Sequence, residues 1–190
     1  MSGKKGGGKR DDSYFAAERR KNKNTRLLLI GAGIGVAIAA VAAAFAYQSI
    51  NPPDPYVLGS AHEHAVFAVI LDGQKIDFSQ DKYQVKSRFI HVENNDGTTI
   101  HRHAVGVPFE FFLESVGMGI QGDCFVRDDG QQFCDDGGKQ LRFFVNGEEV
   151  DLLANYVVED EDRVLVIYGN QTDEEIQQEL TLLDETPVKK

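Results

Sequence analysis

The apolar positions of this chain follow two patterns, and the first is an unbroken run over residues 27–47 that contains no charged side chain. A helix of that length spans about 30 Å, which is the thickness of the hydrocarbon core of a bilayer. We therefore expect a transmembrane helix over 27–49. A cleavable signal peptide is the competing interpretation because Ala44-Phe45-Ala46 matches a cleavage site, although the apolar run is longer than the core of a usual signal sequence.

Small residues recur at every fourth position of this expected span, at Gly31, Gly35, Ala39 and Ala43. Such a stripe lets two helices approach closely, and it would suit a homodimer or a membrane-protein partner. The abundance of Ala and Gly in this segment is the alternative explanation.

The second pattern begins after a Pro-rich linker over residues 50–60 and consists of short β-prone runs separated by turn residues. Residues 62–71 and 74–78 flank the turn dipeptide Asp72-Gly73, and this arrangement predicts a β-hairpin. Because side chains alternate between the two faces of a strand, one face of the first strand is expected to carry His62, His64, Val66, Ala68 and Ile70.

A second hairpin is predicted over residues 88–93 and 98–105, and its register depends on the length of the loop between them. A three-residue loop places His91 directly opposite His101, with Cβ atoms about 5 Å apart. A four-residue loop places Ile100 opposite His91 instead. The sequence leaves both registers open.

A short half-buried helix follows, predicted by apolar residues at helical spacing, namely Phe109, Phe112, Leu113 and Val116. Residues 141–145 and 163–168 predict two more strands. A capping box of Thr172 and Glu175 then predicts the start of a short amphipathic helix, within a final segment over 171–190 that ends in a charged tail.

The predicted fold class is α+β, with an N-terminal transmembrane helix followed by an extracytoplasmic domain over residues 61–170. Antiparallel hairpins pack on one short helix in this domain. The order of hairpin, helix, strand, crossover and strand resembles the β-grasp fold. The stretch Phe143-Phe144-Val145-Asn146-Gly147-Glu148 is similar to the closing half of sulfur-carrier-like β-grasp domains, and this likeness concerns the fold alone.

Charge is distributed unevenly along the chain. Residues 1–26 carry nine basic and three acidic side chains, whereas residues 51–190 carry eleven basic and twenty-seven acidic ones. The first segment has no apolar period that could build a core, so it predicts a disordered tail. Its positive charge predicts a cytoplasmic N-terminus and an extracytoplasmic C-terminal domain in a single-pass protein of the cell membrane. The negative charge of the domain argues against nucleic acid as a partner. The expected partner of the transmembrane helix is membrane lipid.

All five histidines fall within residues 62–103, in two H-x-H pairs and one single position: His62, His64, His91, His101 and His103. Residues two apart on a strand point to the same face, so each pair presents two imidazoles side by side. Neutral imidazoles are common ligands of Cu(II) and Zn(II), and the sequence predicts a copper or zinc site with Glu93 as an outer hydrogen-bond partner or a direct ligand. The alternative is that each histidine is an ordinary polar residue on a solvated strand face.

Catalysis is not indicated by the surroundings of these histidines. A cupin-type motif would have a glutamate after three or four further residues beyond the second pair. After His103 those positions hold Val107 and Pro108, and the next acid is Glu110. We therefore expect metal capture, delivery or assembly rather than turnover. A non-catalytic interaction or accessory module of a membrane complex is the alternative function.

The two cysteines, Cys124 and Cys134, predict a structural disulfide in an oxidising compartment. A thiol-disulfide oxidoreductase or protein-disulfide isomerase is the alternative, although the C-x-x-C spacing that lowers a thiolate pKa is absent between them. Asn170 begins the sequon Asn170-Gln171-Thr172, a candidate glycosylation site on the outer side.

Several of these motifs occur together with the single span, including His62-Glu63-His64-Ala65, Phe89-Ile90-His91-Val92-Glu93 and Asp96-Gly97-Thr98-Thr99-Ile100-His101-Arg102-His103. In this combination the chain resembles a family of uncharacterised archaeal single-span membrane-anchored proteins with paired H-x-H motifs. Members are sometimes labelled protein-disulfide isomerase or thioredoxin-domain protein. The resemblance covers roughly residues 60–170 and implies no established activity.

Overall fold

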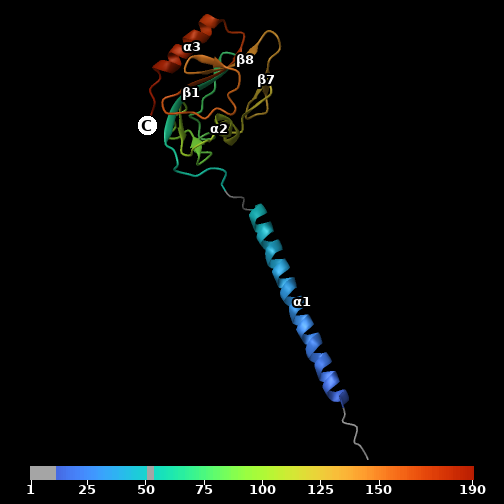
Figure 1. Cartoon of the computed structure of the whole chain (residues 1–190). Helices are drawn as coiled ribbons and strands as arrows, with labels where there is room; N and C mark the ends of the chain where they lie inside the picture. Colours follow the sequence, from blue (N-terminus) through green and yellow to red (C-terminus); the bar gives the residue numbers. More distant parts are fainter. Residues whose placement is uncertain (1–11, 51–53) are drawn as a thin grey trace, which may run out of the picture. The chain divides into compact units, whose positions relative to one another are not determined.

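The computed structural model describes residues 12–50 and 54–190, which divide into two compact units (Figure 1). The first unit contains the helix α1 (Asp12–Ile50). Its part from Arg19 to Ile50 is long and apolar enough to cross a membrane, as a membrane anchor or as a signal sequence. The apolar helix predicted from the sequence is therefore present.

Helix α1 begins at Asp12, well before the predicted start at residue 27. The tail predicted to be disordered over 1–26 is thus helical in its second half, while residues 1–11 lie outside the described part. The physical reason is that about half of residues 12–26 are Arg, Lys, Ala or Glu, which are strong helix formers. Once the apolar helix has nucleated, each added residue gains a hydrogen bond without needing a core of its own.

The second unit, residues 55–190, is built on a seven-stranded mixed sheet. Its strands are β1 (Glu63–Leu71), β2 (Gln74–Lys75), β3 (Ile90–His91), β4 (Thr99–Arg102), β8 (Gln140–Val145), β9 (Glu148–Val150) and β10 (Arg163–Gly169). The order across the sheet is β3-β4-β1-β10-β8-β9, with β2 paired to one end of β1. Strands β1 and β10 form a central parallel pair, and every other pair is antiparallel.

Strand β1 supplies both hydrophobic cores because its side chains alternate between the faces of the sheet. Ala65, Phe67, Val69 and Leu71 enter the larger core, which also contains the buried residues of α2 (Phe109–Ser115). Val66, Ala68 and Ile70 enter the smaller core under α3 (Asp173–Glu185). Both faces of the strand are covered, which explains why it reads as a nearly continuous apolar run.

A second, three-stranded sheet consists of β5 (Gly119–Gln121), β6 (Cys124–Val126) and β7 (Gln132–Cys134). The sequence of this acidic, Gly-rich region predicts the disulfide but none of the three strands. Each strand has only three residues, too few to show a period. The region is ordered by tertiary contacts, since Ile120, Phe125 and Phe133 are buried in the larger core.

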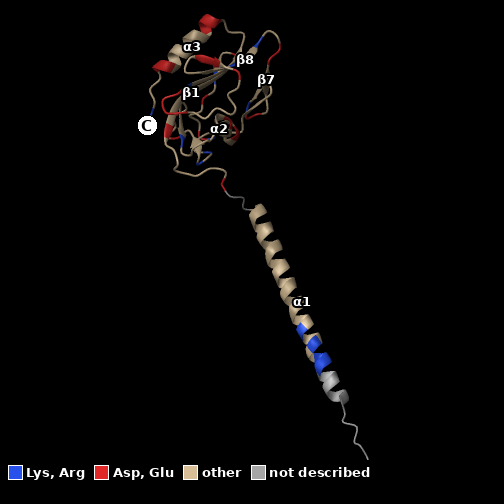
Figure 2. Cartoon of the chain, in the orientation of Figure 1, with Lys and Arg blue, Asp and Glu red and all other residues tan. Residues whose placement is uncertain are grey.

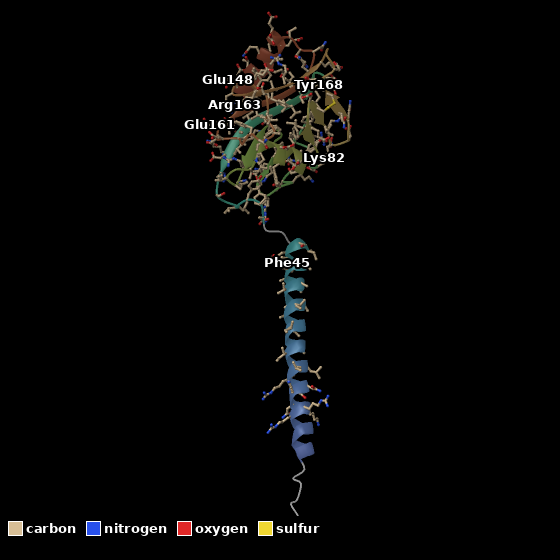
Figure 3. All side chains as sticks on the ribbon, turned by 45° about the vertical axis from the view of Figure 1, so that its right-hand side comes forward. Phe45, Lys82, Glu148, Glu161, Arg163 and Tyr168 are labelled. Carbon is tan, nitrogen blue, oxygen red and sulfur yellow. A yellow bond between two sulfur atoms is a disulfide. The ribbon has the colours of Figure 1, made fainter. Side chains whose placement is uncertain are left out.

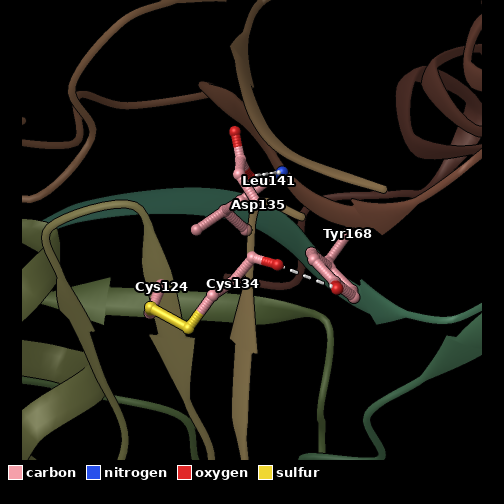
Figure 4. The surroundings of a disulfide bond; sticks show 5 residues. All are labelled: Cys124, Cys134, Asp135, Leu141 and Tyr168. Atoms are coloured by element: carbon pink, nitrogen blue, oxygen red, sulfur yellow. Dashed lines mark hydrogen bonds between the residues drawn. A yellow bond between two sulfur atoms is a disulfide. The ribbon is translucent and has the colours of Figure 1, made fainter. Parts of the chain in front are cut away.

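The predicted disulfide is present in this small sheet. Cys124 and Cys134 are directly opposed on β6 and β7, with their sulfur atoms 2.01 Å apart (Figure 4). The Tyr168 hydroxyl of β10 donates a hydrogen bond of 3.0 Å to the carbonyl oxygen of Cys134. The disulfide-linked hairpin is thereby connected to the central strand of the large sheet.

Two other local predictions can be compared with the structure: the return strand of the first hairpin is shorter than expected, and the capping box is present. The return strand expected over 74–78 ends at Lys75, because Asp77 accepts hydrogen bonds from the amide and hydroxyl of Ser79 and turns the chain. The capping box is present, with the Thr172 hydroxyl accepting from the Glu175 amide and the Glu175 carboxylate accepting from the Thr172 amide. Figure 2 shows acidic residues spread over the second unit, which also carries Lys and Arg, whereas the charged residues visible on α1 are the Lys and Arg of its early turns.

Candidate metal centre

Three neighbouring strands bring the histidines together. His64 of β1 pairs with His101 of β4, and His101 pairs in turn with His91 of β3. This register is the one expected for the three-residue loop, so His91 lies opposite His101 and not opposite Ile100. His62 and His103 lie just outside β1 and β4, two residues from His64 and His101, and strand alternation brings them to the same face.

The five imidazoles form a closed ring of neighbours. Ring centroids are 4.8 Å apart for His62 and His64, 4.9 Å for His64 and His101, and 6.1 Å for His101 and His91. The ring closes through His103, whose centroid is 5.0 Å from those of both His91 and His62. The two H-x-H pairs therefore share one sheet face and face each other across it.

Exposure is graded across this histidine cluster. His64, His91 and His101 are buried, with 5 to 6% of their surface exposed, while His103 is half-buried and His62 is exposed. The cluster lies on the face of β1 that carries Val66, which is covered further along by α3. The histidine cluster thus lies on the same sheet face as the smaller core, beyond the end of that core, and it is accessible to solvent at His62 and His103.

His91 has a defined tautomer. Its Nδ1 lies 2.7 Å from the carbonyl oxygen of Ser87, and a carbonyl oxygen only accepts, so Nδ1 carries the proton. In the neutral ring Nε2 then has the lone pair. Nε2 lies 3.3 Å from Oε2 of Glu93, which is also an acceptor. Two acceptors facing each other favour a proton or a metal cation between them.

Glu93 lies between two imidazoles, because its other oxygen, Oε1, is 4.0 Å from Nδ1 of His101. Two metal bonds of about 2.0–2.2 Å that meet at a tetrahedral angle separate their ligand atoms by roughly 3.3–3.6 Å. The 3.3 Å between Glu93 Oε2 and His91 Nε2 matches this spacing. Glu93 can therefore act as a direct ligand as well as an outer partner.

The charge states suit cation binding. Burial raises the pKa of Glu93, whereas a hydrogen bond from His91, when its Nε2 carries a proton, and the positive charges of protonated His101 and His103 lower it more, so the pKa lies below its ordinary value. Burial, reinforced by neighbouring imidazoles, lowers the pKa values of both His101 and His103 from 6.5. At neutral pH these two rings are uncharged and offer lone pairs beside an ionised carboxylate.

Asp160, for which the sequence predicts no role, contacts His64. Its Oδ1 accepts from the His64 amide at 3.0 Å and lies 3.3 Å from Nδ1 of the same residue. The hydrogen bond from the His64 amide, with a further one from Lys190, lowers the pKa of Asp160 despite partial burial. The only signal in the sequence is an acidic run, Glu159-Asp160-Glu161-Asp162, which lies 96 residues beyond His64.

The ligand atoms do not yet form a coordination sphere. Within residues 12–50 and 54–190, no group of three or more His, Cys, Asp or Glu side chains is arranged to hold a metal ion. The imidazoles are gathered on one face, but their nitrogens do not converge on a single point. Binding would require side-chain rotations, for which the exposed His62 and half-buried His103 have room.

The remaining predicted site residues lie elsewhere. Glu63 is on the opposite face of β1 from His64, 4.0 Å from the guanidinium of Arg102, and does not join the histidine cluster. Asn170 is exposed between β10 and α3. The predicted helix-packing residues are all exposed on α1: Gly31, Gly35, Ala39 and Ala43.

Fold and site together define an α+β protein with a histidine cluster on its sheet and, among the described residues, one candidate membrane-spanning helix. Comparison with known proteins adds no relative, because no family model, no curated protein and no solved structure matches the chain. The resemblance to the archaeal membrane-anchored family stays a prediction.

Proposed function

We propose that this protein is a membrane-anchored metal-binding protein that captures or delivers copper or zinc outside the cytoplasm. The observation that carries the proposal is the closed ring of five imidazoles, contributed by three adjacent strands and flanked by the Glu93 carboxylate. Like-charged imidazolium groups would repel at these distances. Neutral imidazoles that bind one shared cation do not repel each other, so the close approach of the five rings favours a bound cation.

The donor types favour copper first and zinc second. The cluster offers imidazole nitrogens and one carboxylate, which suit Cu(II) and Zn(II) rather than soft monovalent ions. Affinity of a given nitrogen and oxygen site is higher for Cu(II) than for Zn(II) in the general order of divalent metals. A role in capture, delivery or assembly, without turnover, fits a cluster that opens to solvent at His62 and His103.

The placement outside the cytoplasm rests on two features. Basic side chains precede the apolar part of α1, and acidic ones dominate the domain after it, which is the charge order of a protein with its N-terminus inside. The disulfide between Cys124 and Cys134 suits an oxidising compartment.

We also propose that the domain belongs to the β-grasp class, because a central parallel pair flanked by antiparallel strands and one short helix suits that fold.

Metal content of the purified full-length chain in detergent tests the proposal. After loading with Cu(II) or Zn(II) and dialysis, elemental analysis is expected to find one ion per wild-type chain and almost none in His101→Ala/His103→Ala. A control variant, Gln132→Ala/Gln140→Ala, removes two exposed strand side chains away from the cluster and should bind as wild type does.

Equal metal content in wild type and the histidine double variant would refute the histidine site. A wild type that holds no metal would leave the accessory-module interpretation, which a stable partner co-purifying in the presence of chelator would support.

A further inference from the structure

Asp160 reaches the histidine cluster from the segment that precedes β10, where no histidine lies. Its Oδ1 faces the His64 imidazole at 3.3 Å, and the two side chains differ in exposure, with 6% exposed for His64 and 40% for Asp160. Asp160 therefore stands at the rim and His64 lies beneath it.

Backbone hydrogen bonds hold Asp160 in place. The His64 amide donates to Oδ1 of Asp160, and the His64 carbonyl accepts from the Glu161 amide at 2.7 Å. The Val66 amide donates to the Asp162 carbonyl at 2.8 Å. Residues 160–162 thus continue the parallel pairing of β1 with β10, so that the position of the carboxylate relative to His64 is determined by the sheet.

The second oxygen of Asp160 has a separate partner. Lys190 Nζ lies 3.1 Å from Asp160 Oδ2 and 3.3 Å from Glu161 Oε1. The preceding residue is also attached, since the Lys189 amide donates to Thr99 Oγ1 at 3.3 Å. Because Lys190 engages Oδ2, Oδ1 stays directed to His64.

An ionised carboxylate only accepts hydrogen bonds, so Nδ1 of His64 must carry the proton that faces Asp160. Nε2 of the same ring then holds the lone pair. A histidine that donates its second ring nitrogen to a carboxylate is the arrangement that orients imidazole ligands in metal sites and raises their basicity.

We propose that Asp160 is a positioning residue of the metal centre, which sets His64 to bind the ion through Nε2. This inference rests on the proposed function. A merely structural role for Asp160 would change the stability of the domain, whereas a positioning role changes the tautomer of His64 and the metal affinity.

The test compares Asp160→Ala with Glu161→Ala in the full-length chain. Both substitutions remove one carboxylate that binds Lys190, but of the two only Asp160 contacts an imidazole, so Glu161→Ala is a matched control. Glu161 is labelled in Figure 3. Nitrogen-15 NMR of the histidine rings in the metal-free chain reports the tautomer, and competition titration with Cu(II) or Zn(II) reports the dissociation constant.

The expected result is an Nδ1-protonated His64 in wild type and Glu161→Ala, and loss of that tautomer in Asp160→Ala. The dissociation constant should rise by about 10- to 100-fold in Asp160→Ala, as for other outer partners of metal-binding histidines. Asp160→Asn is a second variant, because its amide oxygen can take the place of Oδ1 and accept from both the His64 amide and Nδ1; it should keep the wild-type tautomer.

Equal tautomer and affinity in Asp160→Ala and Glu161→Ala would overturn the inference while leaving the metal centre intact. Absence of metal binding in wild type would overturn the proposed function, and the role of Asp160 with it.

Discussion

At the scale of single residues, the histidine cluster couples folding to pH. The pKa values of His101 and His103 are lowered in the folded chain, mainly by burial. A group with a depressed folded pKa binds fewer protons in the folded state than in the unfolded one. Its contribution to stability is therefore complete above its unfolded pKa of about 6.5 and is lost as pH falls through the folded pKa.

We accordingly expect the free energy of unfolding of the metal-free chain to decrease on acidification below about pH 6.5. The lowered pKa of Glu93 acts in the same direction at lower pH. Denaturant titrations at a series of pH values measure the effect, and His101→Gln/His103→Gln should flatten the profile between pH 7 and the acid range. An identical profile in that variant would show that other groups govern the acid sensitivity.

The same residues explain how much of the site could be predicted. The H-x-H pairs are local, and strand alternation alone brings His62 beside His64 and His101 beside His103. The pairing of His91 with His101 depends on the register of the hairpin. That register is set by the length of the loop at Asn95-Asp96-Gly97, for which the sequence allowed three or four residues. Asp160 could not be found, since an acidic run far along the chain looks like any solvated loop.

At the scale of elements, the disulfide adds a covalent link to the buried contacts that order the small three-stranded sheet. Three-residue strands are too short to be stable alone, and Cys124 and Cys134 join β6 to β7 across the closed loop. A crosslink that closes a loop of about ten residues restricts the unfolded chain and contributes about 2–3 kcal/mol.

The double substitution Cys124→Ser/Cys134→Ser should therefore lower the free energy of unfolding of the domain by about 2–3 kcal/mol. Denaturant titration of the oxidised wild type beside the variant measures the loss, and reduction of the wild type should reproduce it. The metal content should stay at the wild-type level, because neither cysteine belongs to the histidine cluster. A loss of metal in the variant would contradict the separation of the two sites.

The elements were predictable where a period extends over enough residues. Helices α2 and α3 have clear periods and strand β1 is a long β-prone apolar run, and all three were expected close to their observed bounds. Strands β5, β6 and β7 have none, so they appear only once Ile120, Phe125 and Phe133 are buried. The early start of α1 was missed because polar sequence was equated with disorder, although helix propensity does not require apolar residues.

At the scale of the whole molecule, the decisive property is the apolar helix. An anchor keeps the chain in the membrane, whereas a signal sequence would be removed and would release the domain. We expect the expressed chain to remain in the membrane fraction at its full mass after alkaline carbonate extraction. Val36→Lys/Ile38→Lys should release it or block insertion, because each Lys near the centre of a span costs about 2.5–3.5 kcal/mol.

Val57→Lys/Leu58→Lys is the control, since it adds the same charge to exposed positions in the domain segment. It should leave the chain in the membrane. A shortened soluble product in the wild type would identify α1 as a signal sequence and end the anchor interpretation.

What the sequence by itself determined about this protein is everything that depends on near neighbours along the chain. The apolar run, the faces of the first strand, the paired histidines and the capping box follow from spacings of two to four residues. The tertiary structure alone decided the parallel pairing of β1 with β10, the ring of five imidazoles, and the arrival of Asp160 beside His64. These contacts join residues many positions apart, and the packing of two cores on one sheet, rather than any local period, brings them together.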